Sequence, residues 1–199
     1  MLRVAVLVSG GGTNLQALLH AQQRQEIGNC EIVLVLASRA DAYALTRAEN
    51  AGVETAVLAR KAYADARAYD HALLAVLREK RIDLVVLAGF LCILGNEVIA
   101  AYRDKIINVH PSLIPAFCGA GFYGLKVHEA ALARGVTLTG ATVHLVNEIP
   151  DGGRILLQKA VPVQEGDTPE TLQKRVMEEA EWQLLPKALA LLAEQNAQL

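Results

Sequence analysis

The sequence lacks the features that mark nucleic-acid-binding and membrane-spanning proteins. Among its 199 residues, 19 Lys and Arg oppose 21 Asp and Glu, so no excess of positive charge is available to attract a polyanion. Apolar runs such as 4–8 and 84–88 have five residues each, whereas a membrane helix needs roughly 18 to 20. We therefore expect neither a nucleic-acid partner nor a membrane span.

Cysteine is also scarce, and the first apolar run is brief. Cys30, Cys92 and Cys118 are odd in number and widely spaced, which fits neither a disulfide framework nor a metal cluster with short ligand spacing. Gly10 to Gly12 interrupt the first apolar run before it reaches the roughly 7 to 15 residues of a secretory signal. A cytoplasmic protein without a metal is the simplest expectation.

The composition is nevertheless that of a chain that can bury a large core, since 53% of the residues are hydrophobic and 20% are charged. Short runs rich in Val, Ile and Leu alternate with longer amphipathic stretches, which is typical of βαβ units. We predict a single α/β domain over residues 1–199 with a doubly wound, mostly parallel sheet. Strands are expected near residues 3–8, 31–37, 54–58, 83–88 and 105–109. Helices are expected near residues 14–24, 41–51, 65–80 and 95–102.

The pattern changes after the fifth predicted strand. Residues 112–125 contain too many Pro and Gly for a regular element, so a long loop is expected there, followed by a helix near 126–134. Two β-like runs, 139–147 and 154–163, are joined by a Pro-Asp-Gly-Gly turn. A long C-terminal helix should begin near Thr168, which can cap it.

A glycine-rich loop follows the first predicted strand and opens the first helix. Its sequence is Ser9-Gly10-Gly11-Gly12-Thr13-Asn14, so free backbone N–H groups and a helix N-terminus converge where a phosphate would bind. The alternative is a tight strand-to-helix turn capped by Thr13 or Asn14. Leu15 replaces the third glycine of the dinucleotide fingerprint, but Ser38 and Arg39 after the second strand leave an NADP-dependent oxidoreductase open.

Asn108 and His110 are candidate catalytic residues. Residues two apart in a strand project to the same face, and Pro111 ends the strand at the edge where open α/β sheets bind ligands. An amide and an imidazole there would stabilise an oxyanion and move a proton, or would only tie down a loop. Asp151 lies in a turn that Asp favours, but near His110 it would support an imidazolium.

The remaining histidines are expected in packing or surface roles rather than in chemistry. His144 lies inside a β-like run, and His20, His71 and His128 lie on predicted helices.

Several motifs together resemble the phosphoribosylglycinamide formyltransferases, within the folate-dependent formyltransferase family. The resemblance extends from the first strand to the last helix. Its motifs are residues 9–16, Leu-Ala-Gly-Phe at 87–90, Asn-Val-His-Pro-Ser-Leu-Ile-Pro at 108–115, Gly-Ala-Thr-Val-His at 140–144 and Asp-Gly-Gly at 151–153.

The resemblance implies a Rossmann-like formyltransferase fold and transfer of a formyl group from 10-formyltetrahydrofolate to the amine of 5-phosphoribosylglycinamide in purine synthesis, without metal or nicotinamide. It implies a phosphate-binding half, about residues 1–100, and a catalytic and folate-binding half, about 101–199. The catalytic residues by resemblance are Asn108, His110 and Asp151. The substrate-binding residues are Gly12, Thr13, Asn14 and Glu181. The folate-binding residues are Arg67, Leu91, Cys92, Ile93, Leu94 and Asn108.

The family resemblance also implies a backbone conformation and an oligomeric state, and the sequence differs from the family pattern at two places. It implies a cis peptide before Pro115, and a monomer or homodimer that acts on small molecules. Many relatives have a basic residue where Cys92 stands, and the segment 117–124 is longer than in several of them. Both departures affect the predicted folate side.

Overall fold

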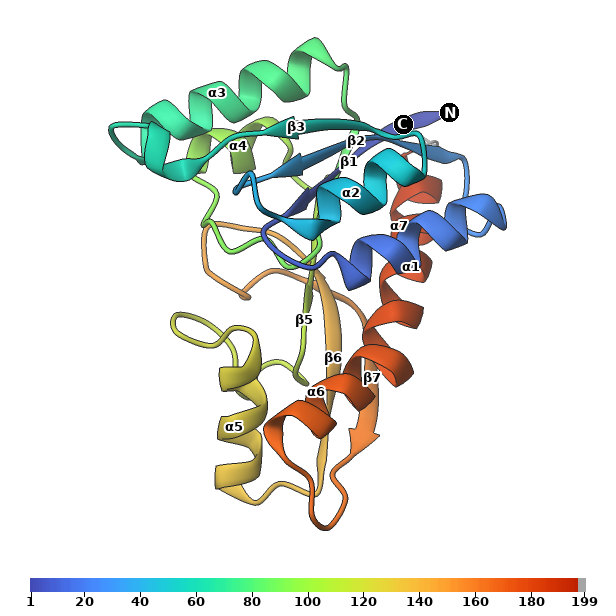
Figure 1. Ribbon diagram of the computed structural model, residues 1–199, viewed down its shortest axis with the longest axis vertical. Coiled ribbons are helices and arrows are strands. Elements are labelled where there is room, and N and C mark those ends of the chain that lie inside the picture. Colours follow the sequence, from blue (N-terminus) through green and yellow to red (C-terminus); the bar gives the residue numbers. More distant parts are fainter. Residues whose placement is uncertain (197–199) are drawn as a thin grey trace.

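The computed structural model, in which residues 1–196 are described, contains one seven-stranded sheet in the order β3-β2-β1-β4-β5-β6-β7 (Figure 1). Neighbouring strands from β3 to β5 are parallel, and β6 and β7 are added antiparallel. The strands are β1 (Leu2–Val8), β2 (Cys30–Ala37), β3 (Glu54–Val57), β4 (Leu84–Leu87), β5 (Ile106–His110), β6 (Leu138–Leu145) and β7 (Ile155–Pro162). The predicted mostly parallel α/β sheet is confirmed.

Helices cover both faces of the sheet, as predicted for a doubly wound fold (Figure 1). The helices are α1 (Thr13–Gln23), α2 (Tyr43–Asn50), α3 (Ala66–Glu79), α4 (Asn96–Ala101), α5 (Leu125–Arg134), α6 (Pro169–Val176) and α7 (Trp182–Asn196). A 3₁₀ turn, Arg60–Ala62, precedes α3, and a π-helical turn, Met177–Glu181, joins α6 to α7.

The two cores follow from the alternation of side chains along each strand. In β1, Val4, Val6 and Val8 belong to a core with residues of α1, α2, α6 and α7, whereas Ala5 and Leu7 belong to a core with residues of α3 and α4. Successive residues of a strand point to opposite faces, so an apolar strand can serve both cores. This burial holds the carboxyl ends of the central strands in place.

Local signals in the sequence explain where two of the helices begin. Asp65 caps α3 by accepting a hydrogen bond from the Ala68 N–H at 2.8 Å. The predicted apolar face of that helix, Tyr69, Leu73 and Leu77, is buried. Thr168 caps α6 and forms a reciprocal pair of hydrogen bonds with Thr171.

The long loop predicted over 112–125 lies between β5 and α5, and the Ile114–Pro115 peptide within it is cis, as expected. Within residues 1–196, no helix combines the length and the apolar character that crossing a membrane requires.

Candidate active site

Strand β5 positions two of the predicted catalytic side chains at its carboxyl end. Asn108 lies opposite His144 of β6, and His110 lies opposite Thr142. Val109 between them is buried in the core. Asn108 and His110 therefore share one face of the strand, as their spacing predicts.

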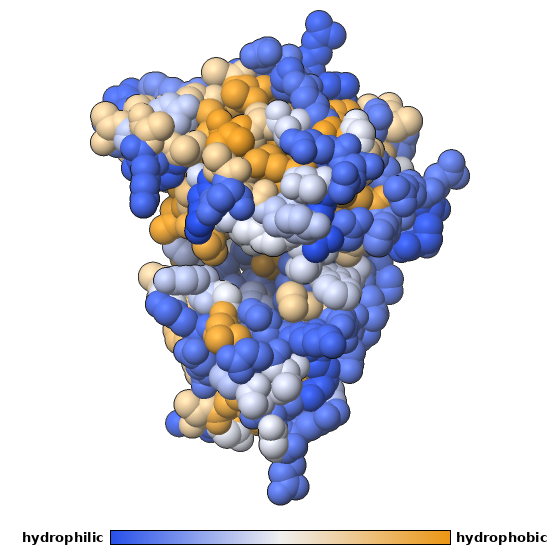
Figure 2. Space-filling model, viewed as in Figure 1, coloured by the Kyte–Doolittle hydropathy of each residue, from blue (hydrophilic) through white to orange (hydrophobic). Residues whose placement is uncertain are grey.

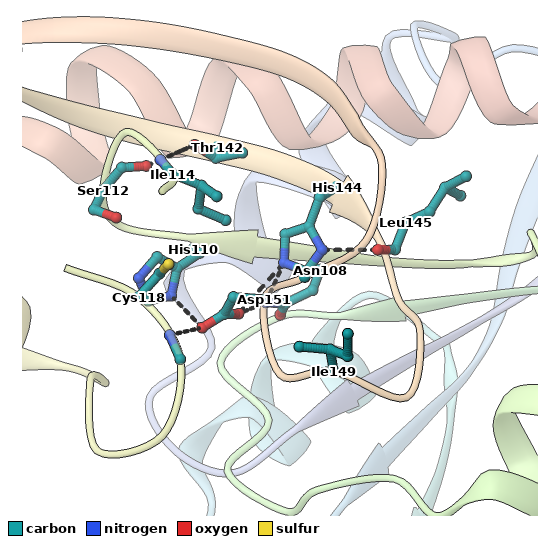
Figure 3. Close-up of polar contacts among 12 residues, drawn as sticks. Asn108, His110, Ser112, Ile114, Cys118, Thr142, His144, Leu145, Ile149 and Asp151 are labelled. Carbon is teal, nitrogen blue, oxygen red and sulfur yellow. Dashed lines mark hydrogen bonds and ion pairs between the residues drawn. The ribbon is translucent and has the colours of Figure 1, made fainter. Parts of the chain in front are cut away.

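Asp151 reaches this pair from the turn between β6 and β7 (Figure 3). Its Oδ2 lies 3.5 Å from His110 Nδ1, and its Oδ1 lies 3.4 Å from both Asn108 Nδ2 and His144 Nε2. Asp151 has a φ of 55°, a left-handed conformation that Asp tolerates better than most residues. The tertiary structure thus brings the amide, the imidazole and the carboxylate together.

The charge of Asp151 is maintained by its neighbours. Burial by itself would raise the pKa of this carboxyl group, but hydrogen bonds from His144 and from the Gly119 N–H, with the nearby His110 imidazole, leave the pKa below its ordinary value. The Gly119 N–H donates to Oδ2 at 2.9 Å. Asp151 is therefore a negatively charged neighbour of both imidazole rings.

The loop between β5 and α5 closes over His110. His110 Nε2 lies 2.8 Å from the Phe117 carbonyl oxygen, which can only accept a hydrogen bond. Nε2 therefore carries a hydrogen, while Nδ1 faces Asp151. The same loop supplies the Gly119 N–H to Asp151, so the segment 117–124 contacts two of the three candidate catalytic residues.

A cavity of about 520 Å³ adjoins these side chains. Figure 2 shows the molecule hollowed midway along its long axis. The cavity is lined by residues 89–93, 108–111, 119–124, Pro150 and Asp151. Its size lies within the range of small-molecule sites, and its lining combines apolar side chains with a few polar ones.

The chain matches the protein-family model described as formyl transferase over residues 2–189. The chain belongs to the formyl transferase family. The matched residues include every strand and all three candidate catalytic residues of the chain. The match confirms the resemblance inferred from the motifs.

Solved structures of family members resemble this chain over nearly its whole length. Glycinamide ribonucleotide transformylase 1 from Symbiobacterium toebii has a TM-score of 0.92 and 42% identity, covering 98% of this chain and 89% of that one. Phosphoribosylglycinamide formyltransferase from Brucella melitensis has a TM-score of 0.86 and 44% identity, covering 96% and 95%.

A human relative is much longer. The trifunctional purine biosynthetic protein adenosine-3 of Homo sapiens is 45% identical over 197 residues, which are 99% of this chain but 19% of that protein. The chain therefore spans about a fifth of the length of that relative.

The predicted phosphate loop has the geometry of an open helix N-terminus. Gly12 precedes α1 with a φ of 73°, and a Cβ atom there would lie 2.6 Å from the Ala44 Cβ, so glycine is required. No side chain caps α1, because Thr13 Oγ1 contacts Met177 Sδ at 3.6 Å and Asn14 contacts Glu181. The alternative of a turn capped by Thr13 or Asn14 is therefore wrong.

Glu181 meets the phosphate loop from the π-helical turn before α7. Asn14 Nδ2 donates to Glu181 Oε2 at 2.6 Å, and both side chains are buried. Burial raises the pKa of the Glu181 carboxyl group to about 7, although the hydrogen bond from Asn14 opposes this shift. The predicted substrate-binding residues therefore form one cluster, which does not line the cavity beside His110.

The predicted folate-binding residues separate into two groups. Leu91, Cys92 and Ile93 line the cavity beside His110, and Leu94 lines a smaller neighbouring cavity that also includes Asn108. Arg67 lies apart from both cavities, with a side chain that is 77% exposed and paired with Glu97 at 3.2 Å. Its folate role remains a prediction.

His144 is the residue at this site that sequence reasoning missed. A packing or surface role was expected, but the ring is buried and contacts both Asn108 and Asp151. The sequence shows only a histidine within an apolar β-like run, because the pairing of this run with β5 is a tertiary feature. His20 and His71 do lie at the surface, bonded to Gln16 and Glu97.

His128 on α5 has the predicted packing role, and it makes stability depend on pH. The residue is 0% exposed, and neither ring nitrogen has a hydrogen-bond partner within the described part of the chain. Burial, with a smaller contribution from His110, lowers the pKa of His128 from 6.5 to about 4. Its ring is therefore neutral in the folded protein at neutral pH.

We predict that His128 destabilises the fold in acid. The His128 ring binds a proton more tightly in the unfolded chain than in the folded protein, so acid lowers the free energy of unfolding. This decrease is absent above pH 6.5 and grows to about 2 to 3 kcal/mol as the pH falls toward 4. Denaturant unfolding at pH 7 and pH 4.5 measures it. His128→Leu should reduce the difference between the two pH values by this amount, and an unchanged difference would contradict the prediction.

Proposed function

We propose that this chain transfers the formyl group of 10-formyltetrahydrofolate to the amine of 5-phosphoribosylglycinamide, giving the formylated ribonucleotide and tetrahydrofolate. The observation that carries this proposal is the convergence of Asn108, His110 and Asp151 at a cavity of about 520 Å³. The family membership supports the reaction type, and the names of the solved relatives support the acceptor.

The two substrates are proposed to meet at one edge of the sheet. The phosphate loop follows β1 and His110 ends β5, with β4 between these parallel strands. Two strand spacings amount to roughly 10 Å, which a phosphoribosyl group can span. The Leu91 N–H donates to Ser9 Oγ at 2.9 Å, so the segment proposed to bind folate is tied to the residue that precedes the glycines.

Attack needs no strong base. An α-amino-type group has a pKa of about 7.7 to 8.0, so a useful fraction of the glycinamide amine is neutral near pH 7. Its nitrogen forms a bond to the formyl carbon, and the carbonyl oxygen acquires negative charge. This charge is absent from the substrates, so groups that stabilise it accelerate the reaction.

His110 and Asn108 are proposed to act on the tetrahedral intermediate. The Nε2–H of His110 donates to the reacting oxygen in place of the Phe117 carbonyl oxygen. The Asp151 carboxylate stabilises the imidazolium from the Nδ1 side. When the intermediate collapses, the bond from carbon to the folate nitrogen breaks. That nitrogen receives one proton, and the attacking amine loses one, so the transfer is balanced.

The two side chains that left an NADP-dependent oxidoreductase open, Ser38 and Arg39, contact other residues of the chain. Ser38 is buried and its hydroxyl lies 2.6 Å from that of Ser9, while Arg39 is paired with Asp41 at 2.6 Å. Neither side chain is arranged to receive a 2′-phosphate.

One assay distinguishes the functions. The protein is mixed with 10-formyltetrahydrofolate and glycinamide ribonucleotide, and formylated product is measured together with tetrahydrofolate. Equal amounts of both are expected. Tetrahydrofolate without formylated ribonucleotide would indicate a deformylase, binding of either compound without product would indicate a sensor, and turnover of NADP would indicate an oxidoreductase.

We predict that the double substitution Thr13→Ala and Asn14→Ala mainly raises the KM for the phosphorylated substrate, by roughly 10-fold or more, because contacts to a charged group are lost. Steady-state kinetics with each substrate varied in turn measures the effect. If the KM for the folate rose and that for the ribonucleotide did not, the assignment of the two sites would be reversed.

A further inference from the structure

His144 is a buried polar group at the site that the proposed mechanism does not use. It lies in β6 opposite Asn108 of β5, and it is 2% exposed. Its ring contacts three groups (Figure 3). Nδ1 lies 2.8 Å from the Leu145 carbonyl oxygen, and Nε2 lies 3.2 Å from Asn108 Nδ2 and 3.4 Å from Asp151 Oδ1.

The contact with Leu145 determines where the ring carries its hydrogen. A carbonyl oxygen can only accept, so Nδ1 must donate. Nε2 then has a free lone pair when the ring is neutral, and it carries a hydrogen only in the imidazolium. The charge of His144 therefore decides whether Nε2 accepts from its neighbours or donates to them.

In the orientation that the structure shows, the amide hydrogens of Asn108 face His144 and Asp151. Asn108 Nδ2 has two hydrogens, and its two neighbouring acceptors are His144 Nε2 at 3.2 Å and Asp151 Oδ1 at 3.4 Å. When both bonds form, neither hydrogen is left for an oxyanion in the cavity. The amide that should stabilise negative charge would then be committed to other groups.

We propose that His144, as an imidazolium, is a positioning residue that turns the Asn108 amide toward the reacting oxygen. Nε2–H donates to Asn108 Oδ1, and Nδ2 with its hydrogens faces the cavity. The two ends of an amide have nearly the same shape, so a half-turn exchanges them in the same space. Asn108 Oδ1 then lies beside Asp151 Oδ1, and the Nε2–H of the imidazolium is the hydrogen that these two acceptors share. The inference rests on the proposed function, because it concerns the oxyanion of that reaction.

Asp151 supplies the charge that this arrangement requires. Its carboxylate lies 3.4 Å from His144 Nε2 and 3.5 Å from His110 Nδ1, and it is the charged partner of both rings. The polar contacts of the His144 ring come from β5, from the turn before β7 and from the next residue of β6. Asp151 thus connects proton transfer at His110 with the orientation of Asn108.

The test is a double-mutant cycle between His144 and Asn108. His144→Leu should lower kcat by roughly 10- to 100-fold while both KM values stay within about twofold, because one transition-state donor is misplaced. His144→Gln, whose amide can still donate, should recover most of this loss. In an Asn108→Ala background, His144→Leu should cause no further loss.

Two results would overturn the proposal. One is an unchanged kcat in folded His144→Leu, and the other is an equal loss whether or not Asn108 is present. If His144→Leu does not fold, His144→Asn, which is polar but too short to reach Asn108, takes its place. His20→Leu, on the exposed side of α1, is the matched control and should keep the wild-type kcat.

A measurement that does not depend on turnover separates this inference from the proposed function. The side-chain amide ¹⁵N–¹H signals of Asn108 should shift in His144→Leu and stay in place in His20→Leu. If the wild type transfers no formyl group, the proposed function fails, yet these signals still report on the contact. Unshifted Asn108 signals in His144→Leu would refute the positioning role.

Discussion

Replacing His110 with alanine is expected to lower kcat by roughly 10² to 10⁴, with smaller changes in both KM values. The imidazole is the group placed to move a proton: Nε2 carries a hydrogen toward the Phe117 carbonyl, and Nδ1 faces the Asp151 carboxylate. Its removal leaves the substrates' binding contacts elsewhere in place. Single-turnover and steady-state kinetics of formyl transfer measure the loss.

The His110 result has a matched control and a clear contrary outcome. His71→Ala removes an exposed histidine, which is paired with Glu97 and lines neither of the two cavities at the candidate site, and should leave kcat unchanged. His110→Ala should also retain the cooperative unfolding of the wild type. A rise in KM for both substrates at constant kcat would show that His110 only holds the loop over the cavity.

Replacing Asn108 with alanine is expected to lower kcat by roughly 10² to 10³, the usual loss for one oxyanion donor. Asn108 lines the cavity together with His110 and Asp151, and its side-chain amide can offer N–H groups to the developing negative charge. Because this charge appears only during the reaction, the effect should fall on kcat rather than on KM.

The Asn108 prediction is checked in the same assay. Asn50→Ala, at the exposed end of α2, is the control and should behave as the wild type. A wild-type kcat in Asn108→Ala would refute the oxyanion role. An increase in both KM values alone would make Asn108 a binding residue instead.

Much of the fold could be predicted because interactions between residues close together in the sequence determine it. The four-residue spacing of Tyr69, Leu73 and Leu77 produces a helix face, and the apolar run of β1 can only be buried on both sides. Thr168 and Asp65 mark helix starts because their oxygens satisfy free N–H groups.

The candidate site was predicted in part. The shared face of Asn108 and His110 follows from the two-residue period of a strand, and the resemblance brought in Asp151. No spacing rule indicated that His144 would contact these residues, because the contact requires β6 to pair antiparallel with β5 in one particular register. The burial of Glu181 against Asn14 likewise joins segments 167 residues apart.

The amino-acid sequence by itself determined which elements form, where the glycine loop lies and which family the chain resembles, because these depend on neighbouring residues and on motif order. Only the tertiary structure decided that Asp151 stands between two imidazoles and that the loop carbonyl of Phe117 meets His110. Such contacts depend on strand order, register and a left-handed turn residue, which act between distant segments and leave no periodic trace along the chain.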